Sequence, residues 1–89
     1  MGEIIAVFKV MPASVETDLA TIEKQLADVV PDGVKLEKVE TKPVAFGLKA
    51  LHATITMEDS EEISVDGIEE AFQGIDGVES VSVEAVGRA

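Results

Sequence analysis

Residues 42–51 read Lys-Pro-Val-Ala-Phe-Gly-Leu-Lys-Ala-Leu, and the chain has the same order of elements on either side of them. Pro43 fixes its own φ and favours an extended conformation at Lys42. Gly47 accepts a positive φ at no steric cost. This stretch therefore predicts a turn that joins two halves of the chain. Phe46, one of only three aromatic residues, is expected either to tuck beneath the turn or to be offered to a partner.

The half before this turn predicts a strand, a helix and a second strand. Apolar residues on both faces of residues 3–10 favour a central, well-covered strand. A helix is expected over residues 17–30, with Ser14 or Thr17 as its N-cap. Residues 34–41 are polar enough to form an edge strand, which their lysines would protect from further pairing.

The half after the turn repeats this order. A strand is expected over residues 48–57, followed by an acidic loop over residues 58–64 and a helix with Ser64 as its N-cap. The last strand is expected over residues 78–85, and residues 86–89 form a tail. One face of that strand is predicted to carry Val81, Val83 and Ala85.

A weak internal repeat supports two similar halves. The triplet Asp32-Gly33-Val34 recurs as Asp76-Gly77-Val78, each time between a helix and a strand. Two βαβ halves joined by a hairpin predict one α+β domain over residues 1–89, a ferredoxin-like βαββαβ sandwich. Right-handed crossovers give an antiparallel sheet of strand order 4-1-3-2, with both helices on one face. The turn and Arg88 are then at opposite ends, roughly 25–30 Å apart.

Charge narrows the class of partner. The chain carries 18 acidic and 7 basic residues, a formal net charge of −11, with no Tyr or Trp. This composition disfavours nucleic acid, whose affinity depends on Lys and Arg and on aromatic stacking, and suits a basic protein partner. The basic residues are unevenly placed, since four lysines fall within fifteen positions around the turn. They are Lys35, Lys38, Lys42 and Lys49.

The sequence offers no covalent chemistry. There is no cysteine, no phosphate-binding glycine loop and only one histidine, His52, which we expect at the surface. The acidic residues lie on predicted solvated segments, where nothing would raise a carboxyl pKa for acid catalysis. We therefore expect no enzymatic activity, metal or cofactor. Neither a signal peptide nor a membrane span is apparent, and the absence of cysteine fits the cytoplasm.

Two stretches resemble the elongation factor 1-beta family. Residues 43–51, Pro-Val-Ala-Phe-Gly-Leu-Lys-Ala-Leu, are similar to the family signature P-[IV]-[AG]-[FY]-G-[IL]-K-x-L. Residues 16–19, Glu-Thr-Asp-Leu, are similar to a motif that follows the family's first strand. The resemblance covers essentially the whole chain, and the length is similar to that of the short archaeal-type factor.

The resemblance implies a ferredoxin-like guanine nucleotide exchange factor for the GTPase elongation factor 1-alpha. It implies that Phe46 docks into the GTPase and that Arg88, where the family often has Lys, approaches the magnesium and phosphate site. Pro43, Gly47 and the flanking Lys42 and Lys49 are the other expected partner-binding residues. We further expect a monomer without a bound nucleotide of its own, without direct contact with nucleic acid and without a membrane.

Alternatives remain open at this stage. An ACT-like module that binds a small molecule has the same βαββαβ order, as do some ribosomal or RNA-binding domains. Arg88 has rival roles too, since it could pair with the acidic loop at its end of the molecule or belong to a frayed tail.

Overall fold

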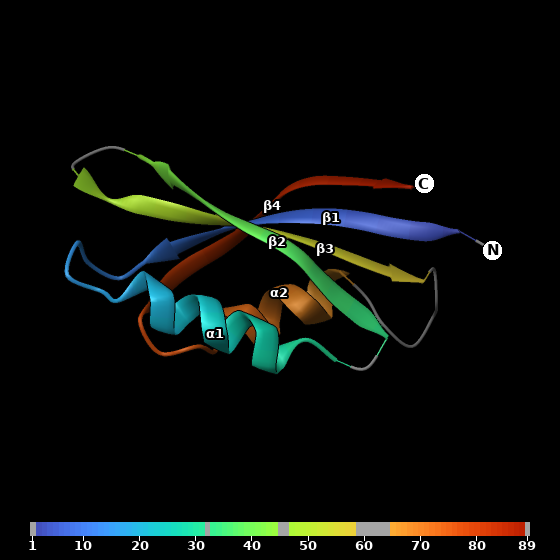
Figure 1. Cartoon of the computed structure of the whole chain (residues 1–89), viewed down its shortest axis with the longest axis horizontal. Coiled ribbons are helices and arrows are strands. Elements are labelled where there is room, and N and C mark those ends of the chain that lie inside the picture. Colours follow the sequence, from blue (N-terminus) through green and yellow to red (C-terminus); the bar gives the residue numbers. More distant parts are fainter. Residues whose placement is uncertain (1, 32, 45–46, 59–64, 89) are drawn as a thin grey trace.

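A four-stranded antiparallel sheet is covered on one face by two helices (Figure 1). The computed structural model describes residues 2–31, 33–44, 47–58 and 65–88. Phe46, Asp32, the predicted N-cap Ser64 and most of the acidic loop lie outside the described residues. The elements in chain order are β1 (Glu3–Pro12), α1 (Leu19–Val29), β2 (Val34–Pro43), β3 (Lys49–Glu58), α2 (Val65–Gln73) and β4 (Val78–Arg88).

The sheet order is β2-β3-β1-β4, which confirms the predicted topology. β1 is central, pairing with β3 on one side and β4 on the other, and β2 is an edge strand as expected. Neither described helix is long and apolar enough to cross a membrane.

The core lies between the sheet and the helices. Alternate residues of β1 point into it, and Ala6, Phe8 and Val10 have no exposed surface. The ring of Phe8 meets the ring of Phe72 on α2 edge-on, with centroids 5.2 Å apart and planes at 82°. This T-shaped geometry is a favoured arrangement of aromatic pairs. Because all the buried side chains of β1 face the helices, the opposite face of the sheet stays uncovered; we call it the open face.

The N-cap of α1 differs from the prediction. Asp18, not Ser14 or Thr17, caps the helix, because its carboxylate accepts hydrogen bonds from the Ala20 N–H and the Thr21 hydroxyl, both at 3.0 Å. The two predicted residues bond to each other instead, since the Ser14 N–H donates to Thr17 Oγ1 at 3.2 Å. This bond lies in a turn that precedes the helix.

β4 also departs from the prediction, since it runs through Arg88 rather than ending at Ala85. Its register against β1 shifts by one residue, so that Val83 lies opposite Phe8 and Ala85 lies opposite Val7. The extra residue between them, Glu84, is a β-bulge. Because directly opposed residues share a face, Ala85 turns to the open face instead of joining Val83 above the core.

Other strand ends lie slightly beyond their predicted limits. β1 continues through Pro12, which pairs with Val78, and β2 continues through Pro43, which pairs with Lys49. Proline is tolerated at both places because one is beside a register shift and the other is on an edge strand.

The predicted repeat is visible in the backbone, since Gly33 and Gly77 have φ values of 90° and 89°. The second of these turns also holds the loop after β1, because the Ala13 N–H donates to the Gly77 carbonyl at 2.8 Å.

We predict that Asp18→Ala lowers the Tm by about 5 °C, because the first turn of α1 loses its N-cap acceptor. The Thr21 hydroxyl and then the Ala20 N–H hold the pKa of Asp18 below its ordinary value of 3.8. The stabilisation from the charged form should therefore be complete above that value and be lost as the pH falls through the folded-state pKa.

Asp18→Asn is the matched control, since Asn caps a helix about as well as Asp but does not titrate. Thermal melts of the variants between pH 3 and 7 test both points. If Thr17→Val lowered the Tm more than Asp18→Ala, Thr17 rather than Asp18 would be the N-cap of α1.

We further predict that Gly47→Ala lowers the free energy of unfolding by about 1 kcal/mol, because an L-residue is strained at positive φ. Gly47 has φ +76° and open space where a Cβ would stand, so backbone strain is the only cost. Gly87 has equally open space without a positive φ, and Gly87→Ala should be nearly neutral. Urea unfolding that gave equal changes for both variants would contradict this account.

Candidate functional site

The β2–β3 hairpin carries four of the predicted contact residues at one end of the molecule (Figure 1). Lys42, Pro43, Gly47 and Lys49 are all exposed. The hairpin is closed by the Val44 N–H, which donates to the Leu48 carbonyl at 2.8 Å. Phe46 falls within this connection, outside the described residues, so its contact with a partner stays a prediction.

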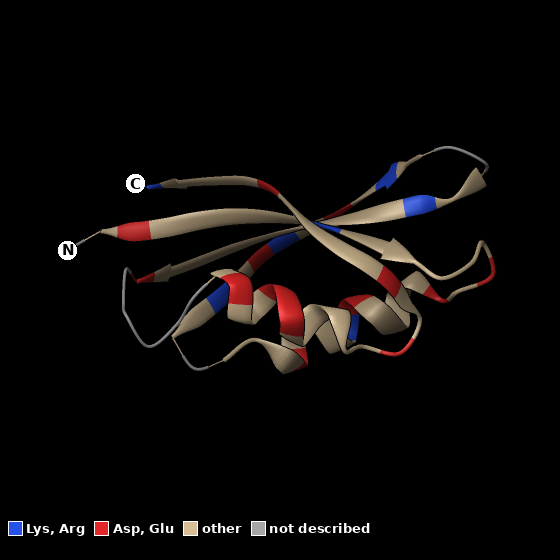
Figure 2. Cartoon of the chain, turned by 180° about the vertical axis from the view of Figure 1, so that it is seen from behind, with Lys and Arg blue, Asp and Glu red and all other residues tan. Residues whose placement is uncertain are grey.

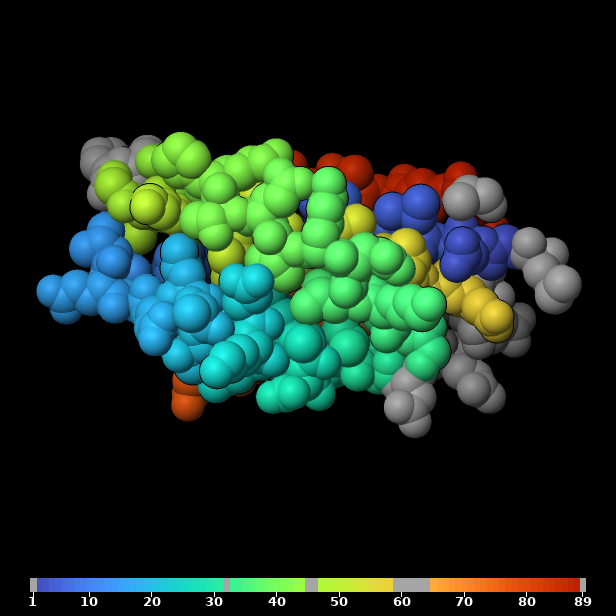
Figure 3. All heavy atoms as spheres, in the orientation of Figure 1, coloured from blue at the N-terminus to red at the C-terminus, as the bar shows by residue number. Residues whose placement is uncertain are grey.

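The loop after β1 lies beside the hairpin (Figure 3). The two border a hollow of about 510 Å³, lined by Gly47 and Lys49 from the hairpin side and by Ser14, Val15 and Asp18 among others from the loop side. Val15 is 64% exposed, which makes it the most exposed of the large apolar side chains described. This end therefore offers apolar, hydroxyl and charged groups from two segments.

The C-terminal end of β4 lies at the other end of the sheet (Figure 1). Its last residue, Arg88, is exposed and pairs with Ile4. This place within β4 does not favour the alternative of a frayed tail. Ile4 packs against the core, and the residue opposite it shares its face. The bulge at Glu84 thus turns the Cβ of Arg88 towards the side of the sheet that carries the helices.

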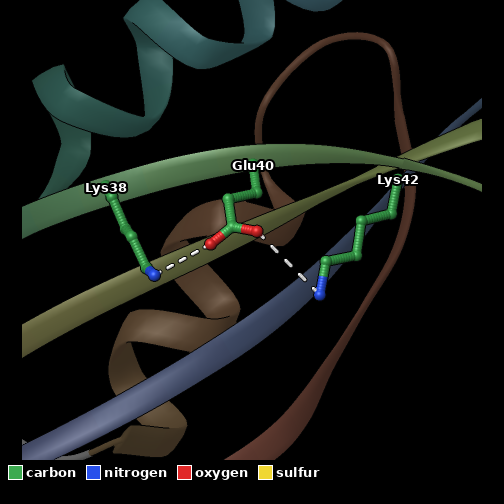
Figure 4. Close-up of polar contacts among 3 residues, drawn as sticks. All are labelled: Lys38, Glu40 and Lys42. Carbon is green, nitrogen blue, oxygen red and sulfur yellow. Dashed lines mark ion pairs between the residues drawn. The ribbon is translucent and has the colours of Figure 1, made fainter.

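Three charged residues of β2 form a short chain of ion pairs beside the hairpin (Figure 4). Glu40 lies 2.8 Å from Lys38 and 4.0 Å from Lys42, and all three side chains are largely exposed. The hydrogen bond and charge of Lys38 hold the pKa of Glu40 below its ordinary value, and Glu40 raises the pKa of Lys38. Exposed pairs of this kind contribute little to stability, so their effect is on the local charge.

The four lysines that surround the turn in sequence do not cluster around it in space. Lys35 pairs with Thr56 near the start of β2, whereas Lys42 pairs with Ala50 near its end. Lys9 joins the same side of the sheet from β1, opposite His52. The alternation of Ile5, Val7 and Lys9 along the first strand already placed this lysine on that face. Lys9 was nevertheless not among the predicted contact residues.

The described residues lack the features of a catalytic or metal site. None of their polar or charged residues is buried, so no carboxyl or histidine has the dry environment that raises or lowers a pKa for catalysis. They also contain no group of three His, Cys, Asp or Glu residues placed to hold a metal ion.

Comparison with a solved structure supports the fold. The C-terminal domain of the MgtC protein from Mycobacterium tuberculosis superposes with a TM-score of 0.61 over 96% of this chain and 87% of that chain. Its sequence identity is only 16%, so this likeness concerns the fold alone.

Comparison with known sequences shows the family as well as the fold. The family model described as the EF-1 guanine nucleotide exchange domain matches residues 5–89. The elongation factor 1-beta of Methanocella arvoryzae is 48% identical over 89 residues, which is 100% of this chain and 99% of that protein. The elongation factor 1-beta of Natronomonas pharaonis is 47% identical over 88 residues, 99% of each chain. These matches do not favour the ACT-like alternative, and the chain belongs to the family of elongation factor 1 guanine nucleotide exchange domains.

Proposed function

We propose that this chain binds elongation factor 1-alpha and promotes GDP release through protein–protein contact alone. The observation that carries the proposal is the family match over residues 5–89, which includes both the hairpin and Arg88. The exchange makes and breaks no covalent bond, so the chain is not an enzyme in the usual sense. It acts in the cytoplasm as a monomer, without bound nucleotide or nucleic acid.

The two ends of the molecule have separate tasks in this proposal. Phe46, between Pro43 and Gly47, anchors the chain on the GTPase, since a rigid aromatic residue loses little conformational entropy when it binds. Arg88 approaches the magnesium and phosphate site of the GTPase. The molecule measures 42 Å along its longest axis, so one interface that reaches both ends must run along its length.

Exchange then follows from linkage between two ligands. If the chain weakens GDP binding, GDP weakens binding of the chain by the same factor. Each tenfold loss of nucleotide affinity requires about 1.4 kcal/mol. A cation placed near the magnesium ion repels it, and loss of the metal loosens the diphosphate.

The direct experiment measures release of labelled GDP from purified elongation factor 1-alpha with and without this chain. The proposal requires acceleration that saturates as the chain is added. No acceleration at any concentration would refute it.

We predict that Phe46→Ala leaves the Tm nearly unchanged but slows GDP release sharply, because truncating a hot-spot residue costs at least ~2 kcal/mol of binding. Circular dichroism melts and the release assay measure the two quantities. If the variant instead loses ~3–5 kcal/mol of stability, as a buried Phe does on truncation, the ring belongs to the core and the anchor is elsewhere.

We predict that Arg88→Lys exchanges nucleotide at close to the wild-type rate, because a point charge is enough to oppose a cation. Arg88→Glu should be strongly impaired, since a carboxylate helps to retain magnesium. Both variants should still bind nucleotide-free GTPase within a few fold of wild type.

A chelator distinguishes this role from a general binding defect. The deficit of Arg88→Glu should shrink when magnesium is removed, since the step that Arg88 serves is then already complete. Lys24→Glu on α1 is the charge-matched control and should behave as wild type. Full-rate exchange by Arg88→Glu in millimolar magnesium would end the proposed role.

A further inference from the structure

The bulge at Glu84 decides on which side of the sheet Arg88 lies. A β-bulge changes the direction of the side chains that follow it, and bulges are common beside functional sites. Beyond Glu84 the pairing with β1 is regular again, and Arg88 lies opposite Ile4. Because Ile4 packs against the core and opposed residues share a face, Arg88 belongs to the side of the sheet that carries the helices, which we call the helical side.

A strand without the bulge would place Arg88 on the other face. Regular pairing throughout β4 would bring Arg88 opposite Glu3 instead of Ile4, and a shift of one residue changes the face. Glu3 is paired in turn with Glu58 of β3, so both of these carboxylates belong to the open face. Figure 2 shows this end of the sheet, with an acidic residue at the start of β1 and a basic residue at the end of the neighbouring β4.

This comparison gives the bulge a consequence for charge. In the regular register, the guanidinium of Arg88 would lie beside two carboxylates of its own chain, and these would compete with an anionic site on a partner. In the bulged register, Glu3 and Glu58 lie on the opposite face from Arg88. One extra residue in β4 therefore separates the cation from both carboxylates.

The helical side is exposed where β4 ends. Val86 lies opposite Ala6 and so shares the side of Arg88, and it is 54% exposed. Val81 lies on the same side earlier in the strand and is only 7% exposed. The helices thus cover this side of β4 more completely before the bulge than after it, and Figure 1 shows the strand continuing past α2 to the C-terminus.

We propose that the bulge at Glu84 positions Arg88 for exchange, and that Arg88 reaches the magnesium and phosphate site of elongation factor 1-alpha from the helical side of the sheet. This inference rests on the proposed function. It adds the side of the domain from which the cation acts and the residue that sets this side. Glu84 contributes because it takes up one residue of β4, not because it touches the GTPase.

Moving the cation along β4 tests the side directly. Arg88→Gly removes the charge and gives the baseline. In that background, Gly87→Arg places a cation on the open face, whereas Val86→Arg places it on the helical side. Both double variants keep the length and net charge of the wild type. Position 87 has open space for a side chain and no positive φ, and Val86 is exposed, so both sites accept arginine.

Side and distance make opposite predictions for these two variants. The cation at position 86 is about 3.3 Å farther along the strand from the original site than the cation at position 87. We nevertheless expect GDP release in millimolar magnesium to be about threefold or more faster with Val86→Arg than with Gly87→Arg, because Coulomb repulsion of the metal falls off slowly with distance on the correct side. Equal rates, or faster release with Gly87→Arg, would overturn the proposal.

Deletions test the register as a second measurement. If Glu84 is deleted, the residues on either side keep their partners in β1, so Arg88 stays opposite Ile4 on the helical side. If Gly87 is deleted as well, Arg88 moves opposite Ile5 on the open face. The single deletion should therefore exchange nucleotide several times faster than the double deletion. The same rate for both would contradict a role of the register.

Two further readouts separate positioning from damage to the fold. Melting curves check that each variant is folded, and all variants should bind nucleotide-free elongation factor 1-alpha within a few fold of wild type, since the hairpin is unchanged. Their deficits in exchange should shrink when magnesium is chelated. A deficit that persists in chelator would assign the effect to binding and overturn the proposal.

The outcomes also separate this inference from the proposed function. If the wild-type chain does not accelerate GDP release, the proposed function itself fails. If it does, and Arg88→Gly is as fast as wild type, the role of Arg88 fails and this inference with it. If Arg88→Gly is slow but the two double variants exchange at equal rates, the inference fails alone.

Discussion

The edge-to-face contact between Phe8 and Phe72 is the interaction on which the rest of the structure depends. It joins the central strand to α2 at the middle of the core, and neither ring has any exposed surface. These two are among the three aromatic residues of the chain. A domain of this size buries a modest core, and its stability is correspondingly sensitive to such a contact.

The same packing explains why the molecule has two unlike sides. β1 directs its most buried side chains towards both helices, and the acidic residues of α1 and α2 face solvent beyond them. The residues between the buried ones in β1 are Ile5, Val7 and Lys9, and they form the opposite face with the lysines of β2. The alternation of a single strand thus produces both the core and the open face.

Much of this fold follows from patterns in the sequence. Alternating apolar residues predicted the central strand, and the repeated Asp-Gly-Val triplet supported two similar halves. The hairpin at residues 42–51, at the end opposite Arg88, also followed from the predicted topology. The signature within that hairpin also identified the family, which the comparisons confirm.

Other features depend on tertiary contacts that periodicity does not report. Three oxygen-bearing residues, Ser14, Thr17 and Asp18, competed for the N-cap, and the bond between the first two left the carboxylate to cap α1. The bulge at Glu84 shifts a register by one residue, which alternation within β4 alone does not reveal. The predicted face of Ala85 was therefore wrong, and so was the prediction that the strand ends before Arg88. The partner contacts of Phe46 and Arg88 stay predictions, since a single chain contains no partner.

The reciprocity of binding tests the central claim most directly. The affinity of this chain for elongation factor 1-alpha is measured by calorimetry with the GTPase nucleotide-free and then saturated with GDP, at fixed magnesium. The account predicts much weaker binding to the GDP-bound form, by the same factor as the chain weakens GDP binding. Equal affinity for the two forms would contradict it, because a protein that does not distinguish them cannot shift the nucleotide equilibrium.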